Sequence, residues 1–194
     1  MNPEAVNELI KNRRSIFPKF YSEEPVAKEV IEQMLENANW APTHRFTEPW
    51  RFKVFHGEGL KKLAEFQSEL YKKKSTEAGD FKERKYQKLV SKPMMASHVI
   101  AIAMKRDTEQ SVPEVEEISA VAMAVQNMYL TATAYGVGCY WGSGGVTYME
   151  EAKPFFDLEA KDKLLGFLYV GNLKGEFPGK GLRKPIADKV TWVG

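Results

Sequence analysis

The chain has few of the residues from which metal and disulfide sites are built. Among its 194 residues there is one cysteine, Cys139, and there are three histidines. A single cysteine cannot form an internal disulfide framework or a cysteine-rich cluster site, and it is typical of a reducing compartment. The histidines (His44, His56 and His98) stand in dissimilar contexts without carboxylates at ligand spacing, so no metal site is expected.

Long apolar runs are also absent. The longest purely apolar stretches, such as residues 99–104 and 120–125, are far shorter than the ~20 residues that span a bilayer. Residues 1–14 carry charges throughout and lack the apolar segment of a secretory signal. We therefore expect a soluble protein with no membrane partner and a cytoplasmic location.

Charge of one sign is not in excess. The 28 lysines and arginines oppose 26 aspartates and glutamates, which leaves a formal charge of +2. A dedicated nucleic-acid binder is more basic, so no nucleic acid is expected as a partner. The length and the 43% of hydrophobic residues suit a single domain over residues 1–194 with a sizeable core.

Hydrophobic periodicity predicts helices and short strands that interleave without a regular β-α-β rhythm. Helices are predicted over residues 3–13, 26–39, 59–92 with a break at Gly79, and 114–135. Strands are predicted over residues 50–56, 99–103 and 164–170, and an extended arm after residue 172. This order favours an α+β fold over a doubly wound sheet.

Several common nucleotide and hydrolase motifs are missing. Residues 136–145 partly mimic G-x-G-x-x-G, but Trp141 occupies the place of the third glycine and the run follows a predicted helix. The sequence also has no G-x-x-x-x-G-K-[ST] loop and no G-x-S-x-G elbow. These absences argue against a Rossmann site, a P-loop and a serine hydrolase.

Two polar clusters suit a phosphorylated, planar cofactor. Arg13, Arg14 and Ser15 follow the first helix and offer forked, charge-assisted hydrogen bonds to a phosphate. The alternative is a cationic helix end that binds nothing. Residues 40–44 lead into residues 48–52, and their tryptophans and histidine offer flat faces and a donor to a ring system. The alternative there is an ordinary helix-to-strand loop with tryptophans in the core.

A third cluster, residues 141–145, is rich in small residues. Small residues let a backbone N–H approach a ligand closely, as the N5 or O4 atom of a flavin requires. A hairpin turn explains this run equally well. Taken alone, the third cluster therefore leaves both interpretations open.

In combination, these clusters resemble the nitroreductase family of FMN-dependent oxidoreductases, most closely its small, single-domain branch. The resemblance rests on segments that occur in the family's order and cover nearly the whole chain. They are residues 13–15, 41–44 with 49–52, 135–138, 141–144, 166–171 and 183–185.

The resemblance implies an α+β, nitroreductase-like fold with a central, mainly antiparallel sheet flanked by helices. It also implies an intertwined homodimer with two FMN sites at its interface. The predicted helix over residues 114–135 is apolar around much of its circumference, so it would lie at that interface. By the same resemblance, Arg13, Arg14 and Ser15 hold the phosphate, ribityl chain and pyrimidine edge of FMN, and Arg183 adds a phosphate contact.

The remaining site residues implied by the resemblance contact the flavin ring. Trp40 and His44 would lie along it. The opposite side of the ring would be contacted by four residues, from the same or the partner subunit: Trp141, Gly142, Ser143 and Gly144. The branch often has an arginine where Gly142 stands, so a charged contact is missing at this position.

The implied activity is hydride transfer from NAD(P)H through flavin N5 to nitroaromatic, quinone-like or flavin acceptors by a ping-pong mechanism. No side chain is assigned a catalytic role, because the cofactor carries the chemistry. One alternative is a flavin-binding sensor or storage protein without fast NAD(P)H turnover. The other is a binding module that uses the basic residues of segment 72–92 to hold an anionic polymer.

The basic segment 72–92 has two interpretations of its own. It is either a solvated helical face or a mobile lid whose charge attracts the 2′-phosphate of NADPH or an anionic acceptor. The neighbouring aromatic residues either line the pocket or pack the helix down. These residues are Phe66, Tyr71, Phe81 and Tyr86.

Overall fold

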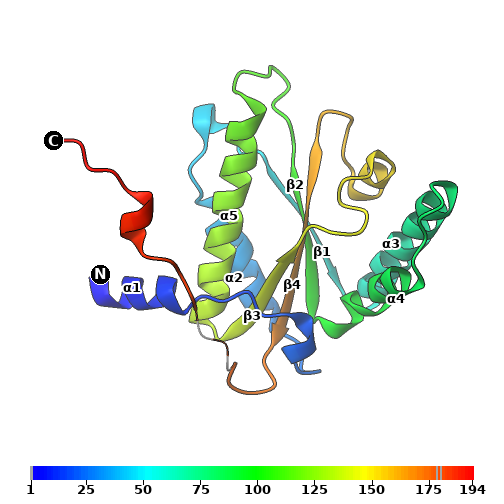
Figure 1. Ribbon diagram of the computed structural model, residues 1–194, viewed down its shortest axis with the longest axis horizontal. Coiled ribbons are helices and arrows are strands. Elements are labelled where there is room, and N and C mark those ends of the chain that lie inside the picture. Colours follow the sequence, from blue (N-terminus) through cyan, green and yellow to red (C-terminus); the bar gives the residue numbers. More distant parts are fainter. Residues whose placement is uncertain (1, 178, 180) are drawn as a thin grey trace.

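The computed structural model describes residues 2–177, 179 and 181–194, and these form an antiparallel sheet covered by helices on both faces (Figure 1). The sheet has the strand order β1-β2-β4-β3. Its strands are β1 (Trp50–His56), β2 (His98–Met104), β3 (Val137–Gly142) and β4 (Lys163–Asn172). The helices are α1 (Pro3–Asn12), α2 (Lys28–Asn39), α3 (Glu58–Glu77), α4 (Glu83–Ser91) and α5 (Glu114–Ala134). The predicted α+β class with an antiparallel sheet and flanking helices is therefore confirmed.

Helix α5 lies along one face of the sheet with α2 beside it, while α3 and α4 cover the other face (Figure 1). The apolar side chains of α5 explain its central place, because Val121, Val125 and Met128 are almost completely buried against the sheet. Strand β2 is buried over all seven residues. Each such aliphatic side chain contributes about 1.5–3 kcal/mol when removed from water. None of the helices in the described ranges is long and apolar enough to cross a membrane.

Strand β3 is the element that the sequence analysis missed. Its sequence, VGCYWG, contains two glycines, which hide a strand pattern and suggest a loop. The structure explains Gly138: a Cβ atom there would lie 2.6 Å from Leu173 Cδ2 and 2.7 Å from Tyr21 Cε1. Packing therefore requires the first glycine of the strand. The third predicted cluster, residues 141–145, begins at the end of this strand and continues as a loop after Gly142.

The basic segment 72–92 spans the end of α3, a turn and α4. Gly79 has a φ of +70° and separates the two helices, as the sequence predicted. The Phe81 ring lies 6.0 Å from that of Tyr71 and 6.1 Å from that of Tyr86. These contacts show that Tyr71, Phe81 and Tyr86 pack α4 onto α3, which was one of the two interpretations, whereas Phe66 stacks on Phe155 with the ring centres 3.8 Å apart.

The end of the chain leaves the body near the end of α1 and extends outward on the α5 side of the molecule as an exposed arm (Figure 1). It is extended as predicted, apart from one 3-10 turn over Ile186–Lys189. Large apolar side chains on the arm are open to solvent, with Leu182 84% and Trp192 93% exposed. Neither of these two side chains therefore packs into the core of its own chain.

A substitution at Gly171 tests the packing that orders the segment after Ser15. The Tyr21 hydroxyl donates to the carbonyl oxygens of Ile16 (2.7 Å) and Tyr169 (3.1 Å). A Cβ atom on Gly171 would lie 2.4 Å from Tyr21 Cδ2, so Gly171→Ala is expected to destabilise the fold by about 1–3 kcal/mol in chemical denaturation. Gly59→Ala is the matched control, because its Cβ would meet nothing nearer than 3.8 Å. Equal stability of the two variants would contradict this role of Tyr21.

Candidate functional site

Tyr129 on α5 connects the Arg13–Ser15 segment to strand β3. The guanidinium of Arg13, which caps the C-terminal end of α1, lies 5.2 Å from the centre of the Tyr129 ring. The backbone N–H of Trp141 donates to the Tyr129 hydroxyl at 2.6 Å. Burial raises the pKa of this phenol, so it stays protonated at neutral pH. Sequence analysis missed Tyr129; the only signal was a phenol within an otherwise apolar helix.

Around this hydroxyl lies an open pocket of about 370 Å³. Its wall consists of Ser15, Tyr129, Trp141, Ser143, Tyr148 and Leu165. The first and third predicted clusters therefore meet in one chain, and Ser15, Trp141 and Ser143 share one pocket.

The loop that follows β3 presents open backbone donors beside this pocket. Trp141 is fixed because its indole N–H donates to the Leu165 carbonyl oxygen at 3.1 Å. Beyond it, a Cβ atom on Gly144 would meet no atom within 4 Å, and Ser143 is exposed. In the part of the chain that the structure describes, the N–H groups of Ser143 and Gly144 reach no acceptor. These N–H groups are free to bind a ligand.

Lys92 brings a half-buried positive charge to the same loop. Its ammonium lies 4.4 Å from the Tyr140 ring centre and 4.3 Å from that of Tyr169. It also lies 3.2 Å from where a Cβ atom on Gly142 would be, so the glycine leaves the ammonium room at this place. Burial, with the nearby Lys88 charge, lowers the pKa of Lys92 to about 8. In the sequence, Lys92 is only one of the positive charges of segment 72–92.

Arg14 and Arg183 differ from Arg13 in their surroundings. Arg14 does not line this pocket, and its guanidinium donates to the carbonyl oxygens of Lys11, Arg13 and Gly179. It thereby holds the start of the arm. Arg183 is exposed and donates to the carbonyl oxygen of its neighbour Leu182. Of the three arginines, Arg13 alone lies against Tyr129, and within the described residues its guanidinium donates no hydrogen bond.

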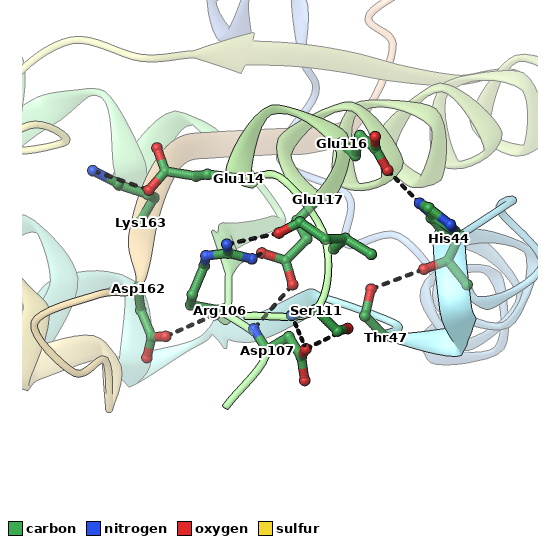
Figure 2. Close-up of polar contacts among 12 residues, drawn as sticks. His44, Thr47, Arg106, Asp107, Ser111, Glu114, Glu116, Glu117, Asp162 and Lys163 are labelled. Atoms are coloured by element: carbon green, nitrogen blue, oxygen red, sulfur yellow. Dashed lines mark hydrogen bonds and ion pairs between the residues drawn. The ribbon is translucent and has the colours of Figure 1, made fainter. Parts of the chain in front are cut away.

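The second predicted cluster lies elsewhere in the chain. His44 Nδ1 is 2.5 Å from Glu116 Oε2, close to the start of α5 (Figure 2). Trp40 is 78% exposed and donates its indole N–H to Glu36 Oε1 at 3.0 Å. Glu116 and Tyr129 are thirteen residues apart on α5, so they are separated by about 20 Å along the helix. One chain therefore does not bring His44 to the Ser15 pocket.

A buried ion pair fixes the end of α5 that carries Glu116. The Glu117 carboxylate, fully buried, accepts from the guanidinium of Arg106 and, at 2.9 Å, from the backbone N–H of Asp107 (Figure 2). Arg106 also donates to the Val112 carbonyl oxygen at 2.7 Å. This network joins the segment after β2 to the start of α5, so it fixes the end of the helix from which Glu116 contacts His44.

Residues 2–177, 179 and 181–194 contain no group of three or more histidine, cysteine or acidic side chains that could hold a metal ion. Cys139 is a free, fully buried thiol whose pKa burial raises strongly. It therefore offers no reactive thiolate. The chemistry available to this chain consists of cationic and hydroxyl groups, open N–H donors and flat aromatic faces.

Comparisons with known proteins agree with this chemistry and with the fold. Residues 10–172 match the model of the nitroreductase family. YfhC of Bacillus subtilis (strain 168), which carries the name of an NAD(P)H nitroreductase, is 30% identical over 187 residues, which cover 96% of this chain and 93% of YfhC.

Two solved structures resemble the whole chain. A nitroreductase-like family protein from Bacillus cereus has a TM-score of 0.80 and 27% identity, and the match covers 100% of this chain and 98% of that one. A protein of Desulfovibrio desulfuricans described as a nitroreductase, in complex with FMN, has a TM-score of 0.73 and 25% identity, with coverage of 100% and 98%. Since the family match covers most of the sequence and the relatives match from end to end, the chain belongs to the nitroreductase family.

Proposed function

We propose that this protein is an FMN-dependent oxidoreductase that uses NAD(P)H to reduce nitroaromatic, quinone-like or flavin acceptors by a ping-pong mechanism. The observation that carries the proposal is the juxtaposition of Arg13, Ser15 and the open 143–144 backbone around Tyr129. A cation that suits a phosphate lies there close to N–H donors that suit a flavin ring. The similarity to YfhC and to the FMN complex from D. desulfuricans supports the same assignment.

The residues present fit FMN on the chemistry of their donors. The Arg13 guanidinium has unused N–H groups that suit a phosphate, and exposed Ser15 offers a hydroxyl beside it. Gly144 has open space where a side chain would stand, so a ring system can approach the backbone there. Arg183 adds a phosphate contact in this proposal if the exposed arm moves toward Arg13.

Bound FMN supplies the relay of hydride from the nicotinamide to the acceptor. The residues of this chain bind the cofactor and orient it. Trp141 and the N–H groups of Ser143 and Gly144 position the ring, while Arg13 and Ser15 anchor the phosphate and the chain that joins it to the ring. Lys92, behind Gly142, stabilises negative charge that develops in the site. No side chain of this chain forms or breaks a covalent bond in the proposal.

The complete site requires two chains. Because His44 lies about 20 Å along α5 from the Ser15 pocket, it reaches a flavin only in the site of a second copy. Trp40 lies outside the Ser15 pocket too, but it faces the other half of α5, where it lines a pocket with Leu130 and Thr131. Apolar surface left uncovered supports a homodimer. On α1 and α5 it includes Val6, Ile10, Val115, Met123 and Tyr135, all at least 37% exposed.

A shared site makes FMN binding depend on protein concentration. On dilution, FMN is expected to leave the protein in step with dissociation of the dimer, because each half-site alone lacks His44. Release of the fluorescent cofactor and the mass of the protein, measured on the same samples, check this result. A monomer that retains all of its FMN would contradict the shared site.

Lys92→Met tests the electrostatic part of the proposal. Loss of one half-buried positive charge is expected to lower the midpoint potential of bound FMN by about 20–40 mV, as for an interaction of about 1–2 kcal/mol. Since the pKa of Lys92 is lowered to about 8, its charge is present below that pH and lost above it. The difference in midpoint potential between Lys92→Met and the wild type therefore shrinks as the pH rises from 7 to 9.

The control for Lys92→Met is Lys73→Met, on the exposed side of α3. Removing that charge is expected to leave the potential unchanged, since solvent and salt screen it. Equal potentials for the wild type and Lys92→Met at pH 7 would show that Lys92 does not act on the site.

Steady-state kinetics test the activity itself. NAD(P)H oxidation with a nitroaromatic and with a quinone acceptor is expected to give parallel lines in double-reciprocal plots, as a ping-pong mechanism requires. Bound FMN without NAD(P)H oxidation would contradict the oxidoreductase and leave the flavin sensor or storage role. Strongly salt-dependent binding of an anionic polymer by a flavin-free protein would favour the basic-patch module instead.

A further inference from the structure

The loop between α2 and β1 carries an exposed aromatic ring on a strained backbone. Arg45, Phe46 and Glu48 have φ angles of 51°, 54° and 42°. Bulky non-glycine residues rarely adopt this left-handed conformation. The sequence places no glycine or asparagine between Trp40 and Trp50 that would relieve the strain. The loop therefore keeps a costly conformation at Phe46.

Contacts at the base of the loop hold this conformation. The Thr43 and Thr47 hydroxyls are 3.2 Å apart, and the Glu48 N–H donates to Thr43 Oγ1 at 3.2 Å. The Thr47 N–H donates to the His44 carbonyl oxygen at 3.2 Å, and the His44 ring is held by Glu116 (Figure 2). The loop is thus tied to α5, and it presents Phe46 in a fixed place.

Phe46 gains nothing from this place within its own chain. Its side chain is 88% exposed, and within the described residues it pairs with no other aromatic ring. An apolar ring in water and a left-handed backbone are both unfavourable. A contact outside this chain would compensate both. The nearest predicted site residue is His44, two positions away, which lines an apolar pocket with Val115 and Met123.

We propose that Phe46 is a specificity-determining residue whose ring packs against the aromatic acceptor in the flavin site completed by a second copy of the chain. This inference rests on the proposed function, since it needs the FMN site and its acceptor. Flat aromatic pairs attract beyond their buried area, so such a wall favours planar acceptors over non-planar ones. The strained loop then serves to place the ring where the acceptor binds.

The test uses the holoenzyme and three variants: Phe46→Ala, Phe46→Asn and Phe46→Tyr. Benzoate, a planar ligand that cannot be reduced, is titrated against the visible spectrum of bound FMN. Its Kd is expected to rise about 3- to 10-fold in the Ala and Asn variants and to stay close to the wild-type value in the Tyr variant. FMN content and dimer mass are expected to remain unchanged in all three.

Two further readouts separate recognition from a structural role. KM for nitrobenzene is expected to rise in Phe46→Ala by the same factor, while KM for ferricyanide, which has no aromatic ring, stays constant. Asparagine tolerates a left-handed backbone, so Phe46→Asn is expected to raise Tm by about 2–4 °C although benzoate binds less well. A higher Tm with weaker benzoate binding is the signature of strain kept for recognition.

The outcomes distinguish this inference from the function on which it rests. A wild type that binds FMN and oxidises NAD(P)H, with a Phe46→Ala variant that binds benzoate equally well, overturns the inference alone. Variants that fall apart into monomers make Phe46 an interface residue and overturn it too. A wild type without FMN or turnover overturns the proposed function and the inference together.

Discussion

Arg13→Ala is expected to weaken FMN binding about 10- to 100-fold while the fold is retained. The Arg13 guanidinium lies over the Tyr129 ring and, within the described residues, donates to no protein acceptor. Its N–H groups are therefore available to a phosphate, and each charge-assisted hydrogen bond is worth about 1.5–3 kcal/mol. Equilibrium dialysis or the quenching of FMN fluorescence on binding measures the change in Kd.

Two other arginines provide matched controls for Arg13→Ala. Arg84 is exposed on α4, so Arg84→Ala is expected to leave FMN affinity unchanged. Arg14 donates to Lys11, Arg13 and Gly179, so Arg14→Ala is expected to release the arm and to affect FMN only as far as the arm contributes. Unchanged FMN affinity in Arg13→Ala would remove Arg13 from the site.

Glu117→Ala is expected to destabilise the protein by about 3–5 kcal/mol, because it leaves the Arg106 guanidinium without its anion. Glu117 is fully buried and Arg106 is only 11% exposed in its side chain. Breaking a buried pair from one side leaves an uncompensated charge, which costs far more than the pair contributes. Thermal unfolding measures the loss, with an expected fall in Tm of about 6–20 °C for a chain of this size.

The double variant Arg106→Met, Glu117→Met separates charge from packing. It removes both charges at similar volume, so it is expected to recover most of the lost stability. Glu114→Gln is the surface control: Glu114 lies 3.6 Å from Lys163 and both side chains are nearly half exposed, so at most about 1 kcal/mol is expected. If Glu117→Ala were as stable as Glu114→Gln, the buried pair would not fix α5.

Elements with strong apolar periodicity could be predicted from the sequence. Strand β1 (Trp50–His56) has the predicted bounds, and α2 and α5 differ from prediction by two residues or fewer at each end. Strand β3 could not be predicted, because Gly138 is present for packing against Tyr21 and Leu173. A local pattern carries no information on such a long-range contact.

The parts of the site could be predicted better than their arrangement. Ser15, Trp141 and Ser143 do share one pocket, and Arg13 lies over the ring of Tyr129, which lines that pocket. Tyr129 itself lies within an apolar helix pattern. Lys92 was equally hidden among surface lysines, because only the fold shows that two tyrosine rings surround it. The assignment of the site residues to FMN remains a prediction.

The placement of the two half-sites could not be inferred from spacing. His44 and Ser15 are 29 residues apart in the sequence, yet the length of α5 separates their surroundings. The sequence analysis allowed residues 141–144 to come from the partner subunit. In the structure Trp141 and Ser143 share a pocket with Ser15 of the same chain, and His44 lies about 20 Å along α5 from that pocket.

The measurement that tests the central claim most directly is the visible spectrum of the freshly purified protein, recorded before and after anaerobic addition of NADPH or NADH. A flavin band that bleaches within seconds, and that returns when a nitroaromatic is added, is the predicted result. A stable flavin band that neither nucleotide bleaches would contradict the oxidoreductase. A colourless protein that cannot be reconstituted with FMN would contradict the flavin site itself.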